Sequence, residues 1–232
     1  MAKPGLRLRI HSEHRSILEE DGDLADDKLS TGLAQLMVNI AEGNVQAVED
    51  CVAVNPALML AYDDEGGWNA ALQCAFYGQM DCLDCVVDHG VDVTALDDSG
   101  RDSLMLAAAQ GHTQMVAHII EQSFADPHLR AHHSQATALH MAAAGGHFGV
   151  AQHLMDAGAL VSIKNAAGKT ALDIAASHLG DEAPITVLLR TRSDLVKSTS
   201  ADISATLLYY LAGFVVCVGF LWYLASYFGH HI

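Results

Sequence analysis

The feature that most constrains this chain is a repeat of about 33 residues. Four polar residues, Asn69, Asp102, Thr137 and Thr170, each precede a short Ala-rich apolar stretch, at intervals of 33, 35 and 33 residues. Side chains of these types accept hydrogen bonds from the N–H groups at the start of a helix, so each predicts a helix N-cap. A fixed period of this length predicts a stacked array of small units.

Each predicted unit contains two short helices. Nine residues after the first three caps come Gly78, Gly111 and Gly146, where a left-handed residue would end the first helix. A second apolar pattern follows, such as MVAHII, and then another glycine and a short extended stretch. The predicted order is helix, turn, helix and hairpin. The two extra residues of the middle interval fall in the loop DPHLRAHHSQ, where they disturb no helix.

Segments on either side extend the array. Residues 33–54 have the same plan of helix, Gly43 and helix without the hairpin signals, as expected for a terminal unit, and APITVLLRT closes the stack. Small residues in the first helices would let neighbouring units approach closely: Ala107, Ala108, Ala142, Ala143, Ala175 and Ala176. We therefore expect an all-α repeat solenoid of four to five units over residues 32–191.

Residues 137–176, TALHMAAAGGHFGVAQHLMDAGALVSIKNAAGKTALDIAA, resemble the ankyrin-repeat family. The likeness extends from about Leu33 to about Thr191, although the Thr-Pro-Leu-His of the family is Asn-Ala-Ala-Leu from Asn69 and Asp-Ser-Leu-Met from Asp102. This resemblance implies a right-handed stack of antiparallel helix pairs with β-hairpin fingers. It also implies a concave surface that binds other proteins, and no catalytic residues.

Composition narrows the function further. A formal net charge of −16 and a pI near 5.0 would repel a phosphate backbone, so nucleic acid is a poor candidate partner. No nucleotide-binding loop, nucleophile elbow or paired-carboxylate motif is present in a recognisable context. We therefore expect neither an enzyme nor a cofactor nor a small-molecule substrate. Five cysteines and a charged N-terminal region without an apolar run favour free thiols in the cytosol.

Histidines and cysteines leave two chemical alternatives open. His112 and His147 directly follow helix-ending glycines, and the family resemblance gives His140 a structural role, with Asp173 at the corresponding position of the next unit. A metal site in the His128–His140 region would use the remaining loop histidines, His128, His132 and His133, but no zinc-type spacing accompanies them. A redox site would use Cys82 and Cys85, whose CLDC spacing falls on a predicted second helix.

Aromatic residues are the best candidates for binding a partner. Phe76 and Tyr77 stand at the end of a predicted first helix, facing the groove, where the other units have Ala109 with Gln110 and Ala144 with Gly145. Trp68 would lie close by, and Trp and Tyr dominate many interfaces. The alternative is that these rings pack against the irregular terminal unit. Acidic residues with one arginine line the predicted finger tips and would suit a basic partner segment: Asp63, Asp64, Glu65, Asp97, Asp98 and Arg101.

Residues 205–228 predict one transmembrane helix. The segment from Ala205 to Phe228 lacks charge, would reach about 36 Å as a helix, and carries aromatic residues such as Trp222 near its ends. Gly213 and Cys217 give a weak small-xxx-small signal for packing in the membrane. We expect a disordered tail over 1–31, a juxtamembrane linker over 192–204 and a short tail over 229–232.

The basic residues before the predicted span favour a cytoplasmic repeat domain on a C-terminal, single-pass anchor. The length of the span favours a secretory-pathway membrane over the mitochondrial outer membrane. The sequence therefore predicts a membrane-anchored adaptor that binds a protein partner through the concave face and fingers. The alternative is an accessory subunit of a larger membrane complex.

Overall fold

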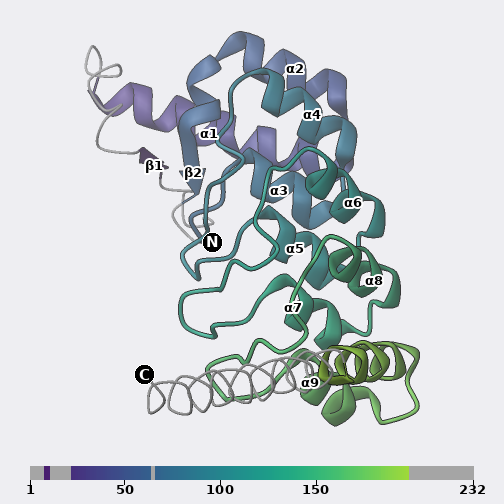
Figure 1. Ribbon diagram of the computed structural model, residues 1–232. Coiled ribbons are helices and arrows are strands. Elements are labelled where there is room, and N and C mark those ends of the chain that lie inside the picture. Colours follow the sequence, from purple (N-terminus) through teal and green to yellow (C-terminus); the bar gives the residue numbers. More distant parts are fainter. Residues whose placement is uncertain (1–7, 11–21, 64–65, 199–232) are drawn as a thin grey trace, which may run out of the picture. The chain divides into compact units, whose positions relative to one another are not determined.

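The computed structural model describes residues 8–10, 22–63 and 66–198. The chain divides into two compact units, Met1–Leu189 and Arg190–Ile232. The first unit holds four complete helix pairs and the start of a fifth, coloured from purple to green in Figure 1. The four complete pairs are α1 (Gly22–Glu42) with α2 (Val45–Val54), α3 (Ala70–Tyr77) with α4 (Met80–Asp88), α5 (Ser103–Gln110) with α6 (Thr113–Glu121), and α7 (Ala138–Gly145) with α8 (Phe148–Asp156).

The fifth pair begins with α9 (Ala171–Leu179), and residues from 184 onward are helical as far as 198. A short 3-10 helix, η2 (Pro56–Leu60), follows α2. It leads into the strand β2 (Ala61–Asp63), which pairs antiparallel with β1 (Leu8–Ile10), so that Arg9 faces Tyr62. These elements form an all-helical repeat, as predicted, and the prediction was of four to five units with irregular first and last ones.

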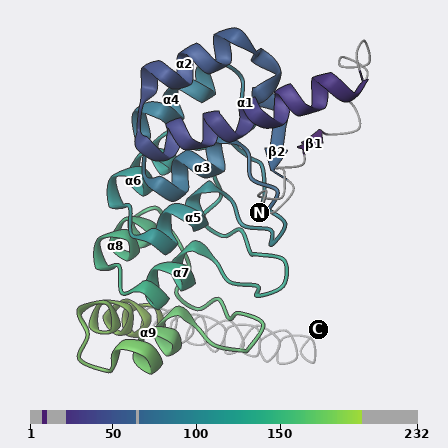
Figure 2. The same ribbon diagram turned by 180° about the vertical axis from the view of Figure 1, so that it is seen from behind.

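The first helices pack side by side in one layer of the first unit, in the order α1, α3, α5, α7 and α9 (Figures 1 and 2). Small side chains make this close approach possible, because Ala107, Ala108, Ala142, Ala143 and Ala175 are wholly buried between neighbouring first helices. Each second helix packs against its own first helix, and the core continues through all units. One unit alone could not bury its apolar face, so the stack is stabilised by its neighbours.

The predicted helix ends are confirmed. Asn69, Asp102, Thr137 and Thr170 are the N-caps of α3, α5, α7 and α9. The side chain of Thr170 accepts from the backbone N–H of Asp173, whose carboxylate accepts in return from the backbone N–H of Thr170, which completes a capping box. At the other ends, the predicted glycines adopt left-handed conformations with φ of 74°, 82° and 76°: Gly78, Gly111 and Gly146.

The predicted β-hairpin fingers are loops closed by turns, and their described residues contain no strand besides β2. Two backbone hydrogen bonds close the loop at Asp97, one from Asp97 N to the Arg101 carbonyl oxygen at 2.9 Å and one from Gly100 N to the Asp97 carbonyl oxygen at 2.8 Å, which is too little for a ladder. Other backbone groups bond the neighbouring loop. The successive donors and acceptors are Asp98 N with Gly66 O (3.0 Å), His132 N with Ser99 O (2.9 Å) and Ala166 N with Ser134 O (2.8 Å).

Two predicted boundaries are wrong. The expected division at residues 31 and 32 falls inside α1, whose buried Leu33, Leu36 and Ile40 belong to the core and favour a single long helix. The expected linker over 192–204 is helical through residue 198, because it continues the helix that starts at residue 184. The predicted transmembrane segment, 205–228, lies outside the described residues. Among the residues that are described, no helix has the length and apolar character needed to cross a membrane.

Candidate functional site

Three aromatic rings cluster at the C-terminal end of α3. The centroids of the Trp68 and Phe76 rings are 4.9 Å apart with the planes tilted by 59°, and those of Phe76 and Tyr77 are 5.2 Å apart in an edge-to-face arrangement. Trp68 and Phe76 are half-buried, whereas Tyr77 is 42% exposed. The cluster therefore has one supported ring, Phe76, and one ring, Tyr77, that presents apolar surface to solvent.

The local chain geometry fixes this cluster in place. Gly78 ends α3 directly after Tyr77, and the ring of His112 in the next unit donates from Nε2 to the carbonyl oxygen of Phe76 at 2.9 Å. That bond satisfies an acceptor at the end of the helix, where no intrahelical partner exists. The two rings are therefore attached to a helix end that the following unit holds.

Non-aromatic residues, three of them Ala or Gly, occupy the corresponding positions of the next two units. Phe76 corresponds to Ala109 and Ala144, and Tyr77 to Gln110 and Gly145. Gln110, Ala144 and Gly145 are exposed, and Ala109 is partly exposed. Beside the rings the surface is thus lined by short side chains, which leaves room for a partner's side chains to contact the aromatic cluster.

Asp63 positions Trp68. Its Oδ1 accepts from the backbone N–H of Trp68 at 2.7 Å and from that of Gly66 at 3.1 Å, while its own N–H donates to the Trp68 carbonyl at 2.9 Å. The carboxylate therefore closes the loop and is committed to backbone donors. Asp63, predicted as part of an acidic rim, serves chiefly to build that loop.

Arg101 and Asp97 repeat this arrangement one unit later. Asp97 Oδ1 accepts from the backbone N–H groups of Ser99 and Arg101, and its Oδ2 lies 2.7 Å from both Nε and a terminal nitrogen of Arg101. Asp97 is 4% exposed. Arg101, predicted as part of the partner-binding rim, has its guanidinium paired with Asp97 inside its own loop, and its side chain is 34% exposed.

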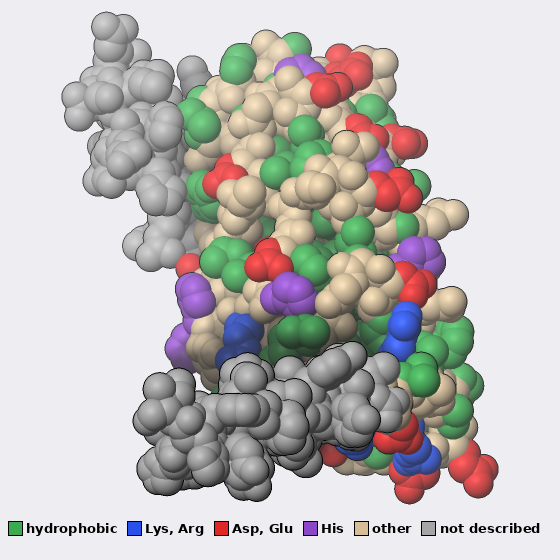
Figure 3. All heavy atoms as spheres, in the orientation of Figure 1, with side chains coloured by type: hydrophobic (Ala, Val, Ile, Leu, Met, Phe, Trp, Pro, Cys, Tyr) green, Lys and Arg blue, Asp and Glu red, His purple; other side chains and the backbone are tan. Residues whose placement is uncertain are grey.

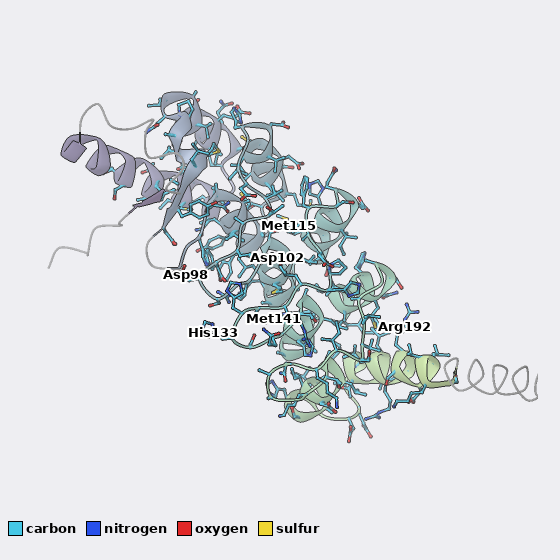
Figure 4. The ribbon with its side chains drawn as sticks, turned by 60° about the vertical axis from the view of Figure 1, so that its left-hand side comes forward. Asp98, Asp102, Met115, His133, Met141 and Arg192 are labelled. Atoms are coloured by element: carbon cyan, nitrogen blue, oxygen red, sulfur yellow. The ribbon has the colours of Figure 1, made fainter. Side chains whose placement is uncertain are left out.

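The remaining residues predicted as partner-binding at the rim are Asp98 and Asp64. Asp98 is exposed, and Figure 4 shows it on the loop side of the stack together with His133. Asp64 lies outside the described residues.

Sequence reasoning missed the turn-closing role of Asp63, Asp97 and Asn165. The signal was their spacing, because Asp97 follows Asp63 by 34 residues and Asn165 follows Asp97 by twice 34.

Comparison with known families agrees with this architecture. A family model described as ankyrin repeats, three copies, matches residues 36–131 and 104–199. The chain belongs to the ankyrin-repeat family. A curated relative, the E3 ubiquitin-protein ligase Ufd4 of Drosophila melanogaster, is 25% identical over 187 residues, which cover 68% of this chain. The chain spans about 7% of the length of that relative.

His112, His140 and His147 have structural roles, as predicted, and each of them connects neighbouring units. His147 donates from Nε2 to the Ala109 carbonyl at 3.1 Å, in the same way as His112 one unit earlier. His140 is 2% exposed, its Nδ1 accepts from the Thr137 backbone N–H at 3.2 Å, and its Nε2 lies 3.2 Å from the Lys169 carbonyl. Burial lowers the pKa of His140, so the neutral ring is favoured.

The two chemical alternatives gain no support from the described residues. His128, His132 and His133 are exposed, and nowhere in the described ranges do three His, Cys, Asp or Glu side chains gather as a metal site would need. Cys82 and Cys85 are free thiols that are 1% and 8% exposed on α4. Burial raises the pKa of both thiols, which disfavours the reactive thiolate.

Proposed function

We propose that this chain is a membrane-anchored ankyrin-repeat adaptor that binds a partner protein beside the ring cluster of Trp68, Phe76 and Tyr77. Ankyrin repeats imply protein–protein interaction. The observation that carries the choice of site is Tyr77, an exposed ring packed edge-to-face on a half-buried one. A rigid aromatic residue that is already ordered loses little conformational freedom when a partner covers it.

The surroundings of the rings support a protein ligand over a small molecule. The short side chains of Ala109, Ala144 and Gly145 continue from the rings along the first helices, so an extended or helical segment can lie across several units. Asp98 would attract a basic residue of that segment near the ring cluster. Aromatic anchors with a charged rim are the arrangement from which most interface energy comes.

The membrane part of the proposal rests on the sequence of residues 205–228. An uncharged span of that length would anchor the chain, with the ankyrin units in the cytoplasm and a secretory-pathway membrane favoured. Confining the units to a surface raises their effective concentration toward partners on the same membrane, so modest affinity is sufficient. Alkaline carbonate extraction followed by protease protection of an N-terminal epitope tests both the anchoring and the orientation.

The binding site is tested with a pair of matched variants. Tyr77 and Phe148 are both 42% exposed, but Phe148 lies at the start of α8, in the layer of second helices. Full-length chains carrying Tyr77→Ala or Phe148→Ala are used to capture proteins from cells, and the captured proteins are compared by quantitative mass spectrometry. Proteins lost with Tyr77→Ala and kept with Phe148→Ala support the site, whereas identical captured sets contradict it.

Phe76→Ala gives a second measurement at the same site. Because Phe76 is half-buried between Trp68 and Tyr77, this variant should lower stability by about 1–2 kcal/mol as well as weaken capture. Tyr77→Ala should leave the melting temperature nearly unchanged. A large loss of stability with Tyr77→Ala would mean that the rings serve the core rather than a partner.

Deletion of residues 205–228 separates the adaptor from the alternative role. An adaptor without its span should still capture the partner through the ring cluster, although it would no longer fractionate with membranes. An accessory subunit of a membrane complex should lose its complex on the same deletion, because its contacts would lie within the bilayer.

A further inference from the structure

Charge is divided unevenly along the ankyrin units. Residues 63–102 contain ten Asp or Glu and a single Lys or Arg, Arg101. Residues 127–172 contain one acidic residue, Asp156, together with three Lys or Arg and six histidines. The first complete units are therefore strongly acidic, whereas residues 127–172 carry a small excess of positive charge, in a chain whose formal net charge is −16.

The basic residues lie on the loops that precede α7 and α9. Arg130, Lys164 and Lys169 are exposed, and so are His132 and His133 on the first of these loops. Figure 3 shows histidine and Lys or Arg side chains gathered over the loop before α7. We call the two loops, residues 126–136 and 160–169, the cationic loops.

Hydrogen bonds hold the cationic loops in fixed register. The guanidinium of Arg130 donates to the Lys164 carbonyl at 2.6 Å, and Ala166 N donates to the Ser134 carbonyl at 2.8 Å. The cations of two units are thus presented from one connected backbone surface. A ligand that binds there does not have to order the loops, which lowers the entropic cost of binding.

Nearby carboxylates neutralise these cations only in part. Asp173 uses its carboxylate to accept from the backbone N–H and the hydroxyl of Thr170, both at 2.8 Å. These bonds, together with the charges of Lys164 and Lys169, hold the pKa of Asp173 below its ordinary value. Asp126 accepts from the backbone N–H of His128. Two carboxylates therefore face three permanent cations, and both are already engaged by the backbone of their own loops.

We propose that the cationic loops bind an acidic segment of the same partner protein whose apolar residues contact the ring cluster. The proposal rests on the proposed function, because it places that partner across the units with a basic or apolar part beside Tyr77 and an acidic part beside Arg130, Lys164 and Lys169. The charge gradient of the units would then fix the direction in which the partner lies.

The distance between neighbouring units sets the spacing of acidic residues expected in the ligand. Neighbouring units are about 10 Å apart, the usual distance between packed helices, and an extended chain covers about 3.3 Å per residue. Acidic residues at every third position would therefore meet one cationic loop after another. An anionic membrane surface fits less well, because its wide negative face would also meet the excess negative charge of the chain, whereas a narrow peptide meets the loops alone within the screening length of about 8 Å.

The direct test measures binding of an acidic peptide to the full chain in non-ionic detergent. The probe is a fluorescein-labelled peptide of four Glu-Ser-Gly repeats, and its Gln-Ser-Gly counterpart is the neutral control. Anisotropy at 50 mM salt should show binding of the first peptide and not of the second, with weaker binding at 300 mM salt. Equal binding of both peptides, or of neither, would overturn the proposal.

Matched variants distinguish binding at the cationic loops from a general effect of net charge on peptide binding. Lys164→Gln with Lys169→Gln should weaken binding of the acidic peptide about fivefold, as expected for two partly screened surface charges. Arg190→Gln with Arg192→Gln removes the same charge from the second compact unit and should change the affinity less than twofold. Equal losses for the two pairs would show a net-charge effect and contradict the proposal.

Three further measurements complete the test. Arg130→Lys keeps the cation but alters the bond to the Lys164 carbonyl, so near-normal binding of the peptide would show that charge, rather than loop structure, is responsible. Vesicles of one part phosphatidylserine to three parts phosphatidylcholine should not displace the peptide. Displacement would assign the loops to a lipid surface instead. Loss of partner capture with Tyr77→Ala while the acidic peptide still binds would separate the ring cluster from the cationic loops.

Discussion

Asp102 occupies in the third unit the place that Asn69 occupies in the second, and the two side chains differ in one hydrogen bond. Asn69 Oδ1 accepts from Leu72 N at 3.0 Å, and Asp102 Oδ1 accepts from Met105 N at 2.8 Å. Asn69 also donates from Nδ2 to the Asp92 carbonyl at 2.7 Å. An ionised carboxylate has no donor for such a bond, and burial raises the pKa of Asp102 from 3.8 to about 6.

We predict that Asp102→Asn stabilises the protein at pH 7 by about 1–3 kcal/mol. The variant keeps the N-cap oxygen, removes a buried charge that neighbouring Asp126 and Asp97 disfavour, and supplies the donor that Asn69 uses one unit earlier. The free energy of unfolding, measured with urea at several pH values, checks this. Asn69→Asp is the reverse change and should destabilise the second unit under the same conditions.

The difference in stability between Asp102→Asn and the wild type should depend on pH, and its direction tests the raised pKa of Asp102. Because the folded pKa of Asp102 is raised, the folded state holds the proton more tightly, and wild-type stability falls as pH rises from about 4 to about 6. The advantage of the variant should therefore be largest above pH 6 and disappear near pH 4. A constant difference between the two proteins over this range would show that Asp102 does not titrate with a raised pKa.

The contribution of His140 to stability should depend on pH in the opposite direction to that of Asp102. Burial lowers its pKa below 6.5, so the folded state favours the neutral ring, and its contribution to stability is complete above pH 6.5 and lost as pH falls through the folded pKa. We predict that His140→Ala costs about 2–4 kcal/mol at pH 7, because it removes bonds to Thr137 and to the Lys169 carbonyl in the next unit. Unfolding in urea from pH 5 to pH 8 measures both effects.

Asp173→Ala provides the comparison for His140. Asp173 closes the capping box with Thr170 at the corresponding position but is exposed, so its loss should cost about 1 kcal/mol. Equal costs for the two substitutions would mean that the bond from His140 to the following unit adds nothing to the stack. A wild-type stability curve parallel to that of His140→Ala below pH 6.5 would exclude the proposed titration.

The sequence predicted the helices well because their signals are local. An N-cap such as Asn69 and a left-handed glycine such as Gly78 act within one turn of the helix end at which they lie. Because the repeat is about 33 residues long, the same kinds of signal recur in successive units. The rings of Trp68, Phe76 and Tyr77 were also brought together as expected, since the period placed the foot of one loop beside the end of the next helix.

The loops were predicted less well because their hydrogen bonds join different units. Asp97 and Arg101 are four residues apart, and as charged residues they suggested a solvent-facing rim, yet the structure pairs them inside the loop. The bonds from one loop to the next, such as His132 N to the Ser99 carbonyl, replace the expected hairpin pairing. The bonds between loops join two units, so the pattern of one unit could not predict them, whereas the pair of Asp97 and Arg101 lies within one loop.

The buried cysteines should be unreactive in the folded protein. Burial raises the pKa of the Cys74, Cys82 and Cys85 thiols, whereas Cys51 is only partly buried. Iodoacetamide at pH 8, with mass spectrometry of the peptides, should label Cys51 before Cys74, Cys82 and Cys85, which should react only after unfolding in urea. Rapid labelling of Cys82 in the folded protein would revive a redox role for the CLDC segment.

Substitution of Gly78 and of Gly168 by alanine distinguishes backbone strain from a steric clash as sources of lost stability. Both are left-handed, with φ of 74° and 73°, but a Cβ on Gly78 would lie 2.7 Å from the His112 ring, whereas nothing lies within 4 Å of one on Gly168. Gly168→Ala should cost about 1 kcal/mol from backbone strain alone. Gly78→Ala should cost about 2–4 kcal/mol, because the His112 ring must also move and lose its bond to the Phe76 carbonyl.

Urea unfolding of the two glycine variants measures the difference in stability, and partner capture shows whether the ring cluster is affected. Because His112 holds the last turn of α3, Gly78→Ala should also loosen the helix end that carries Phe76 and Tyr77, and so weaken partner capture. Gly168→Ala lies in the loop before α9 and should leave the ring cluster unchanged. Equal losses of stability in the two variants would show that the contact between Gly78 and His112 does not couple the second and third units.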